Sequence, residues 1–118
     1  MKTIQRYTFL LLSLVLLASC QTDYTTLPTY NSKKQLQAVI EVPAGSSTKL
    51  HYNRQTKAFE AEQQAGQDRI IPFLPYPANF GFIPSTETNA QKKPLDVVVL
   101  AGSLASGTVM EVIPVGVL

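Results

Sequence analysis

The chain has 118 residues, a formal net charge of +2 at pH 7 and a single cysteine, Cys20. This length suits one small domain, and one cysteine excludes an internal disulfide. The charge excess comes from Lys2 and Arg6, in a leading segment that we expect to be removed, which leaves eight basic and eight acidic residues. A neutral domain has no electrostatic support for binding nucleic acid.

Residues 1–20 have the pattern of an export signal. A short positive region precedes an apolar run over residues 9–17, and the segment ends in the small residues and cysteine of LASC. An apolar run of this length is too short to cross a bilayer comfortably as a helix. The pattern therefore predicts a signal peptide over residues 1–19, which is not part of the fold.

LASC resembles the lipobox of bacterial lipoproteins, in which the cysteine is lipidated and becomes the new first residue. The resemblance implies that Cys20 carries a lipid and that the protein is exported and anchored to a membrane of the bacterial cell envelope. An ordinary signal peptide, an anchor that is never cut and a free thiol are the alternatives. Residues 20–35 are polar and rich in threonine, which predicts a flexible tether between lipid and domain.

The rest of the chain has short β-branched runs between turn signals and almost no helical periodicity. About six strands at such spacing predict a mainly β fold, a sandwich or a barrel. Residues 101–107, AGSLASG, are interpreted as a hairpin loop. The expected strands are LQAVIEV (36–42), TKLHYN (48–53), KAFEA (57–61, pairing back on its predecessor), DRIIPFL (68–74), LDVVVLAG (95–102) and GTVMEVIPVGVL (107–118).

The end of the chain is apolar, with no polar tail after TVMEVIPVGVL. An apolar strand at a sheet edge favours aggregation unless something covers it. We expect either that this strand is buried in the middle of the sheet or that the chain lacks a piece that covers it. Cover by a second copy of the chain, in a homo-oligomer, is a third arrangement.

Residues 75–84 read PYPANFGFIP and combine three aromatic rings with three prolines and a glycine. Proline removes an N–H and fixes φ, and glycine opens conformations that other residues avoid. The composition is poor for a helix and for a central strand. It predicts a stiff stretch that carries rings.

YPANFGFIP resembles the segment YP-x-N-[YF]-G-[YF]-I of the soluble family of inorganic pyrophosphatases. Four further segments resemble that family in its own order, namely VIEVPAGSSTK, QDRIIPF, PLDVVVL and GTVMEVIPVGVL. The resemblance covers about Gln37 to Leu118 and implies an OB-like β-barrel, which helices flank in the family. We therefore expect residues 36–118 to be a truncated pyrophosphatase-like barrel domain that lacks the family's C-terminal part and helices.

The resemblance also implies roles for single residues. Lys49 and Arg69 match the family's phosphate-binding lysine and arginine. Glu41 matches a glutamate that supports the metal site, and Asp96 matches the last aspartate of the metal-binding cluster. Phe80 stands where the family has a tyrosine whose hydroxyl reaches a phosphate, so the ring is kept without the hydroxyl. Without the resemblance, Lys49 and Arg69 would be solvated strand charges.

The rest of the family's metal site is replaced. Its cluster D-x-D-P-x-D corresponds to NAQKKPLD, with Gln91 and Lys93 at the first two aspartates. Lys92 and Lys93 repel Mg²⁺ at close range. His51 stands where the family usually has glutamate and is interpreted as an exposed strand histidine. The family's later aspartates and its lysine–tyrosine pair have no counterpart before Leu118. Mg²⁺ is thus implied as the cofactor of an incomplete site.

The implied function is Mg²⁺-dependent hydrolysis of pyrophosphate to two phosphates, weak or lost in this chain. The alternatives are a non-catalytic, lipid-anchored module that binds a phosphate ligand, a degenerate fragment, and an envelope β-module unrelated to phosphate. The sequence has no Walker loop, no HExxH and no GxSxG. Glu60, Glu62 and Asp68 are interpreted as surface charges.

Overall fold

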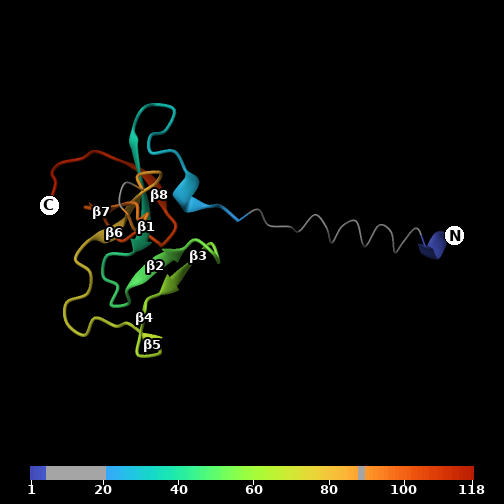
Figure 1. The fold of residues 1–118 in the computed structure, drawn as a ribbon, viewed down its shortest axis with the longest axis horizontal. Coiled ribbons are helices and arrows are strands. Elements are labelled where there is room, and N and C mark those ends of the chain that lie inside the picture. Colours follow the sequence, from blue (N-terminus) through green and yellow to red (C-terminus); the bar gives the residue numbers. More distant parts are fainter. Residues whose placement is uncertain (5–20, 88–89) are drawn as a thin grey trace.

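The computed structural model describes residues 1–4, 21–87 and 90–118. The predicted signal peptide therefore lies outside the described residues apart from residues 1–4, and the predicted lipidation site Cys20 lies wholly outside them. Figure 1 shows a domain built from strands, preceded by one short 3-10 helix. Its elements are η1 (Tyr24–Thr26), β1 (Leu36–Val42), β2 (Leu50–Asn53), β3 (Ala58–Ala61), β4 (Gln63–Gln64), β5 (Gln67–Asp68), β6 (Asn79–Ile83), β7 (Leu95–Val99) and β8 (Val109–Val112).

A four-stranded antiparallel sheet in the order β7-β6-β1-β8 forms the centre of the domain. Strands β2 and β3 form a hairpin that packs against β1, and β4 and β5 form a smaller hairpin beyond it (Figure 1). The predicted mainly β class is confirmed, and the arrangement agrees with an OB-like fold. Within the described residues the sheet keeps open edges at β7 and β8, so the barrel is not closed.

Strand β1 lies inside the sheet, and its side chains are buried on both faces. On one face, Ala38 and Ile40 join a cluster with residues of β6 and β7. On the other face, Val39 packs with Tyr52 and Phe82, which fastens the β2–β3 hairpin to the sheet. Burying one such aliphatic or aromatic side chain stabilises a fold by about 1.5–3 kcal/mol. The consecutive apolar residues Ala38 to Ile40, all fully buried, form the part of β1 that is covered on both sides.

The aromatic stretch departs from its prediction, because Asn79–Ile83 is an inner strand of the sheet between β1 and β7. Its prolines flank the strand rather than interrupt it, so the hydrogen-bonded ladder stays intact. Gly81 pairs with Ile40, and a Cβ atom on Gly81 would lie 2.8 Å from the carbonyl carbon of Val39. Glycine therefore permits the close approach of β6 to β1.

Asn79, at the start of β6, is fully buried and ties two loops to the sheet. Its Oδ1 accepts hydrogen bonds from the backbone N–H of Ala44 at 3.0 Å and of Leu104 at 2.9 Å. Its Nδ2 donates to the carbonyls of Ala101 at 3.3 Å and Gly102 at 3.0 Å. One amide thus satisfies four backbone groups that would otherwise be buried without partners.

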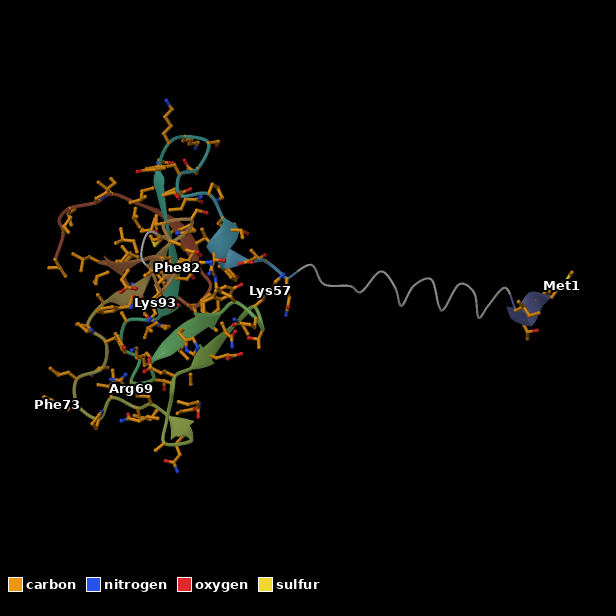
Figure 2. All side chains as sticks on the ribbon, viewed as in Figure 1. Met1, Lys57, Arg69, Phe73, Phe82 and Lys93 are labelled. Carbon is orange, nitrogen blue, oxygen red and sulfur yellow. The ribbon has the colours of Figure 1, made fainter. Side chains whose placement is uncertain are left out.

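The strand predicted over residues 68–74 is mostly wrong. β5 ends at Asp68, and an isolated bridge between Thr48 and Ile70 follows it. Pro72 has no N–H to donate to a ladder, and the chain turns away from the sheets. Phe73 projects outward from this loop in Figure 2 and is 83% exposed.

The predicted last strand and the predicted hairpin loop are also corrected. The strand 107–118 is reduced to β8, and the strand 95–102 ends at Val99. Residues 101–107 are no hairpin loop, because β6 and β1 separate β7 from β8. β8 is an edge strand, so burial in the middle of the sheet is wrong. The exposed apolar side chains beyond it are those of Ile113, Val115, Val117 and Leu118.

The segment 20–35, expected as a tether, contacts the domain in its described part. Thr25 in η1 is buried. The ring of Tyr24 lies 5.3 Å from that of Tyr52 and 5.2 Å from that of Phe59, edge to face in both pairs. Such aromatic pairs add favourable energy beyond the area they bury. Across the parts of the chain that the structure describes, we find no helix with the length and apolar character needed to span a membrane.

Candidate anion and metal site

Glu41, Phe80 and Asp96 lie on one face of the central sheet. Val39 pairs with Phe82, and Phe82 pairs with Asp96. Alternate residues of a strand share a face, so Phe80 and Asp96 lie on the face that Phe82 and Val39 present to the β2–β3 hairpin. Glu41 sits at an irregularity of the β1–β6 pairing and reaches the same hairpin. The register thus gathers the two acidic candidates from two strands far apart in the sequence.

Glu41 is held in a partly buried position. The backbone N–H of Tyr52 donates to its Oε1 at 2.7 Å. Burial raises the pKa of Glu41, the Tyr52 hydrogen bond opposes that shift, and the negative charge of Asp96 adds to it. The charges of His51 and Lys49 lower the same pKa. Glu41 therefore lies within electrostatic reach of an acid and two basic groups.

Lys49 and Arg69 meet at one carboxylate, that of Glu62. Lys49 Nζ lies 2.7 Å from Glu62 Oε2, and Arg69 Nη1 lies 2.7 Å from Glu62 Oε1. The three side chains remain 34–42% exposed. The structure thus brings together the two cations that the sequence predicted as phosphate ligands, and it shows that a single anion can contact both.

The backbone fixes this arrangement. Lys49 N–H donates to the carbonyl of Arg69 at 3.2 Å, Glu62 N–H donates to that of Lys49 at 2.8 Å, and Arg69 N–H donates to that of Glu62 at 2.6 Å. These bonds join the start of β2 to both ends of the β4–β5 hairpin. The three side chains therefore start from adjacent backbone positions.

Glu62 was missed as a site residue by the sequence interpretation, which made it a surface charge. Hydrogen bonds from Lys49 and Arg69 lower its pKa to about 2, so it is ionised at physiological pH. A signal was present in the sequence. A turn at Ala65 and Gly66, both with positive φ, pairs Gln63 with Asp68, and the next residues outward are Glu62 and Arg69.

His51 is an exposed strand residue, as the sequence predicted, whereas Phe80 lies in the inner strand β6 and not in a segment outside the sheet. The half-buried ring of Phe80 packs edge to face against Tyr76, with centroids 4.9 Å apart. His51 is exposed on β2 and pairs in register with Glu60. In the described residues 90–118, Gln91 and Lys93 are also exposed.

The donor groups of the described residues fit one Mg²⁺ better than several. Among the described residues, no three side chains of His, Cys, Asp or Glu gather closely enough to hold a metal ion. Mg²⁺ usually takes one or two carboxylates from the protein and completes its shell with substrate phosphates and water. Glu41 and Asp96 are two carboxylates on one face of the sheet, which is the number that a single Mg²⁺ usually takes.

A separate shallow depression of about 440 Å³ lies beside η1. It is lined by Thr25, Thr26, Arg54, Ser85 and Glu87, and Arg54 forms an ion pair with Glu87 across it. None of the four predicted site residues lines it, so we place the candidate site at the sheet face and the β2 start instead.

Comparison with known proteins identifies the family. The model of the inorganic pyrophosphatase family matches residues 38–118. The inorganic pyrophosphatase of Saccharolobus solfataricus is 37% identical over 93 residues, covering 77% of this chain and 50% of that protein. The enzyme of that name from Thermus thermophilus is 42% identical over 82 residues, covering 68% of this chain and 43% of its own length.

Solved structures agree with the sequence comparison. The crystal structure of inorganic pyrophosphatase from Thermus thermophilus superposes with a TM-score of 0.62 at 34% identity, covering 76% of this chain and 49% of that chain. The structure of an inorganic pyrophosphatase from Coxiella burnetii gives a TM-score of 0.57 at 29% identity, with 71% and 48% covered. The chain spans about half the length of the curated relatives it matches. By sequence and by fold, the chain belongs to the inorganic pyrophosphatase family.

Proposed function

We propose that this chain binds pyrophosphate between Lys49 and Arg69 and hydrolyses it slowly with the help of Mg²⁺. The observation that carries the proposal is the convergence of both cations on one carboxylate, each at 2.7 Å. A carboxylate and a phosphoryl group present oxygens of similar size and charge, so the same two cations suit either. Family membership supplies pyrophosphate as the substrate to test.

The chain's own residues have separable roles in this proposal. Arg69 offers a planar fork for two phosphoryl oxygens, and Lys49 offers a compact point charge. Glu41 and Asp96 would hold Mg²⁺ on the adjoining sheet face. When bound, Mg²⁺ neutralises phosphoryl charge and lowers the pKa of coordinated water. Glu41 would also stay positioned by its hydrogen bond from Tyr52.

Slow turnover follows from the small number of carboxylates. Pyrophosphate carries several negative charges, and its hydrolysis depends on neutralising charge on both the attacked and the leaving phosphate. Gln91 and Lys93 take positions where the family has acidic ligands. Each lost cation removes several kcal/mol of transition-state stabilisation, which is at least about a hundredfold in rate.

Phosphate release from pyrophosphate by the purified full-length chain in detergent tests the proposal. We expect slow release that requires Mg²⁺ and is abolished by Asp96→Asn. Glu111→Gln is the matched control, because it removes a carboxylate from the exposed edge strand β8 and should leave the rate unchanged. Release that is insensitive to Asp96→Asn would show that the sheet face holds no working metal site.

A non-catalytic phosphate-binding module is the second candidate, and the absence of a three-residue metal cluster among the described residues favours it. Titration calorimetry with pyrophosphate separates the two. Binding that is lost in Lys49→Gln and Arg69→Gln, with no phosphate release from the wild type, would identify the module. Absence of both binding and release would contradict the anion site itself.

Export and lipid anchoring at Cys20 are also proposals, supported by the leading sequence MKTIQRYTFLLLSLVLLASC. They place the domain in the bacterial cell envelope. Mass spectrometry of the protein from bacterial membranes should find lipid on Cys20 and an N-terminus at that residue. A Cys20→Ser variant that fractionates and migrates like the wild type would contradict the anchor.

A second copy of the chain is the remaining partner that we propose. Its support is the pair of open sheet edges, β7 and β8, in the described part of the chain, since unpaired edge strands readily pair with another chain. Sedimentation of a homogeneous monomer in detergent would contradict this association, and a defined dimer would support it.

A further inference from the structure

The carboxylate of Glu62 lies between Lys49 and Arg69, the two cations that the proposed function assigns to the phosphate ligand. Its two oxygens are each hydrogen-bonded to one of the two cations, Oε2 to Lys49 and Oε1 to Arg69. An incoming anion cannot contact Lys49 Nζ and Arg69 Nη1 in the same way while Glu62 remains between them. Together, Lys49, Arg69 and Glu62 carry a net charge of +1, whereas the two cations alone would carry +2.

The backbone geometry keeps the Glu62 carboxylate beside Lys49 and Arg69. Its backbone is hydrogen-bonded to Lys49 on one side and to Arg69 on the other, at 2.8 and 2.6 Å. The carboxylate thus begins next to both cations and reaches them without help from a flexible loop. Because its pKa lies at about 2, neutral pH offers no route to release it by protonation.

We propose that Glu62 is an internal competitor that an anionic ligand must displace from Lys49 and Arg69 before it binds. The proposal rests on the proposed function, because it takes these two cations as the anion site. Glu62 thereby weakens the binding of every phosphate ligand at this site, because each ligand must break the same two ion pairs. Its side chain is 34% exposed, so solvent is available to the carboxylate once it has swung away.

Displacement differs from simple repulsion in what it predicts for ligands of different charge. If Glu62 leaves the site, every ligand must break the same two ion pairs. Removing the carboxylate then increases the affinity for inorganic phosphate and the affinity for pyrophosphate by the same factor. If Glu62 stayed in place and repelled the ligand, removing the carboxylate would increase the affinity for the more highly charged pyrophosphate by the larger factor. The two ligands therefore report which process occurs.

Glu62→Gln in the full-length chain is the test, with affinity for pyrophosphate and for inorganic phosphate measured by titration calorimetry. Glu60→Gln is the matched control. It removes an equal charge from the adjacent strand β3, where Glu60 accepts hydrogen bonds from Asn53 and Thr56 and contacts neither cation of the site. We expect Glu62→Gln to bind both ligands roughly threefold to tenfold more tightly, the effect of two exposed ion pairs, and Glu60→Gln to bind like the wild type.

Equal or weaker binding by Glu62→Gln would overturn the proposal, since Glu62 would then position the cations rather than compete with the ligand. A larger gain for pyrophosphate than for phosphate would overturn displacement. After either of these outcomes the anion site itself would still be upheld, provided that the wild type binds the ligand and that Lys49→Gln and Arg69→Gln abolish this binding. If neither wild type nor Glu62→Gln binds either ligand, the anion site and the competitor fail together.

A measurement on the wild type keeps the proposal testable if the variant does not fold. The side-chain carboxyl carbon of Glu62, followed by ¹³C NMR, should shift on addition of pyrophosphate. With Lys49 and Arg69 engaged by the ligand, its pKa should return from about 2 toward the ordinary value of 4.5. A Glu62 signal whose titration is unchanged at saturating pyrophosphate would overturn the displacement.

Discussion

The backbone N–H of Tyr52 donates to the side chain of Glu41 at 2.7 Å, which joins the β2–β3 hairpin to the central strand at the point where the candidate metal and anion groups meet. The charges of Asp96, His51 and Lys49 all shift the pKa of the same carboxylate. One acidic side chain therefore has both a structural and a chemical role, and substitutions can separate the two.

Glu41→Leu should destabilise the fold by about 2 kcal/mol, because it leaves the partly buried N–H of Tyr52 without an acceptor. Glu41→Gln keeps an oxygen at nearly the same place and should cost less than half as much. Both should lose any Mg²⁺-dependent phosphate release. Urea unfolding measures the first effect and phosphate release the second. Equal destabilisation by the two variants would show that charge, and not the hydrogen bond, holds Glu41.

Tyr24→Ala should destabilise the domain by about 2–3 kcal/mol, because it removes a ring that packs on Tyr52 and Phe59. Tyr30→Ala is the matched control. Tyr30 is 59% exposed and its bridge to Leu36 uses backbone atoms, so its loss should change stability by no more than about 0.5 kcal/mol. Thermal unfolding followed by circular dichroism compares them. Similar midpoints would mean that η1 contributes no more than a tether would.

The sequence predicted the strands whose apolar pattern agrees with their burial. LQAVIEV became β1, and KAFEA paired back on the preceding strand as β3. It did not predict β6, because the prolines around NFGFI obscured a strand that contains none. The region 68–74 failed for the opposite reason, since DRIIPFL has strand-like residues but Pro72 interrupts the ladder. Segment boundaries thus depended on where a proline falls relative to backbone hydrogen bonds.

For the site, resemblance to a family supplied the two cations and the two acids, and the structure supplied their neighbours. The turn at Ala65 and Gly66 could have set Glu62 opposite Arg69, but neither composition nor spacing could add Lys49, because that contact depends on how the β4–β5 hairpin returns to the start of β2. The buried network of Asn79 was equally invisible, since its partners lie in loops up to 35 residues away.

Asn79→Ala should destabilise the fold by about 3 kcal/mol, because it leaves buried backbone donors and acceptors of two loops unpaired. Ser103→Ala is the control on the same loop. Its exposed hydroxyl donates a single bond to the carbonyl of Ala44, so its loss should cost about 1 kcal/mol or less. Urea unfolding of both variants gives the comparison. A loss for Asn79→Ala no larger than for Ser103→Ala would contradict the role of the amide.

The ion pairs of Glu62 should make stability depend on pH in acid. Its pKa is about 2 in the folded chain against an ordinary 4.5, so the folded state binds this proton less readily than the unfolded state. Its contribution is therefore fully present above about pH 4.5 and is lost as the pH falls through about 2. Because the pair is exposed, the effect is small and weakens with salt.

The measurement is the urea midpoint of wild type and of Glu62→Gln at about pH 6 and about pH 2.5. The wild type should be the more stable protein at the higher pH, and the difference should shrink at the lower pH. Glu60→Gln again serves as the control for a lost surface carboxylate. A difference between wild type and Glu62→Gln that is constant with pH would mean that the carboxylate is not ionised against Lys49 and Arg69.

Restoring acidic residues beside Asp96 should increase turnover if too few carboxylates limit it. The double variant Gln91→Asp/Lys93→Asp replaces an exposed amide and an exposed cation with groups that Mg²⁺ prefers. We expect at least about a hundredfold faster phosphate release, the value of one additional bound cation, together with tighter Mg²⁺ binding. Lys33→Asp/Lys34→Asp, on an exposed turn before β1, changes charge without entering the site and should have no such effect. Tighter Mg²⁺ binding with an unchanged rate would show that turnover is limited by something other than metal ligands, and would favour a chain that binds pyrophosphate without hydrolysing it.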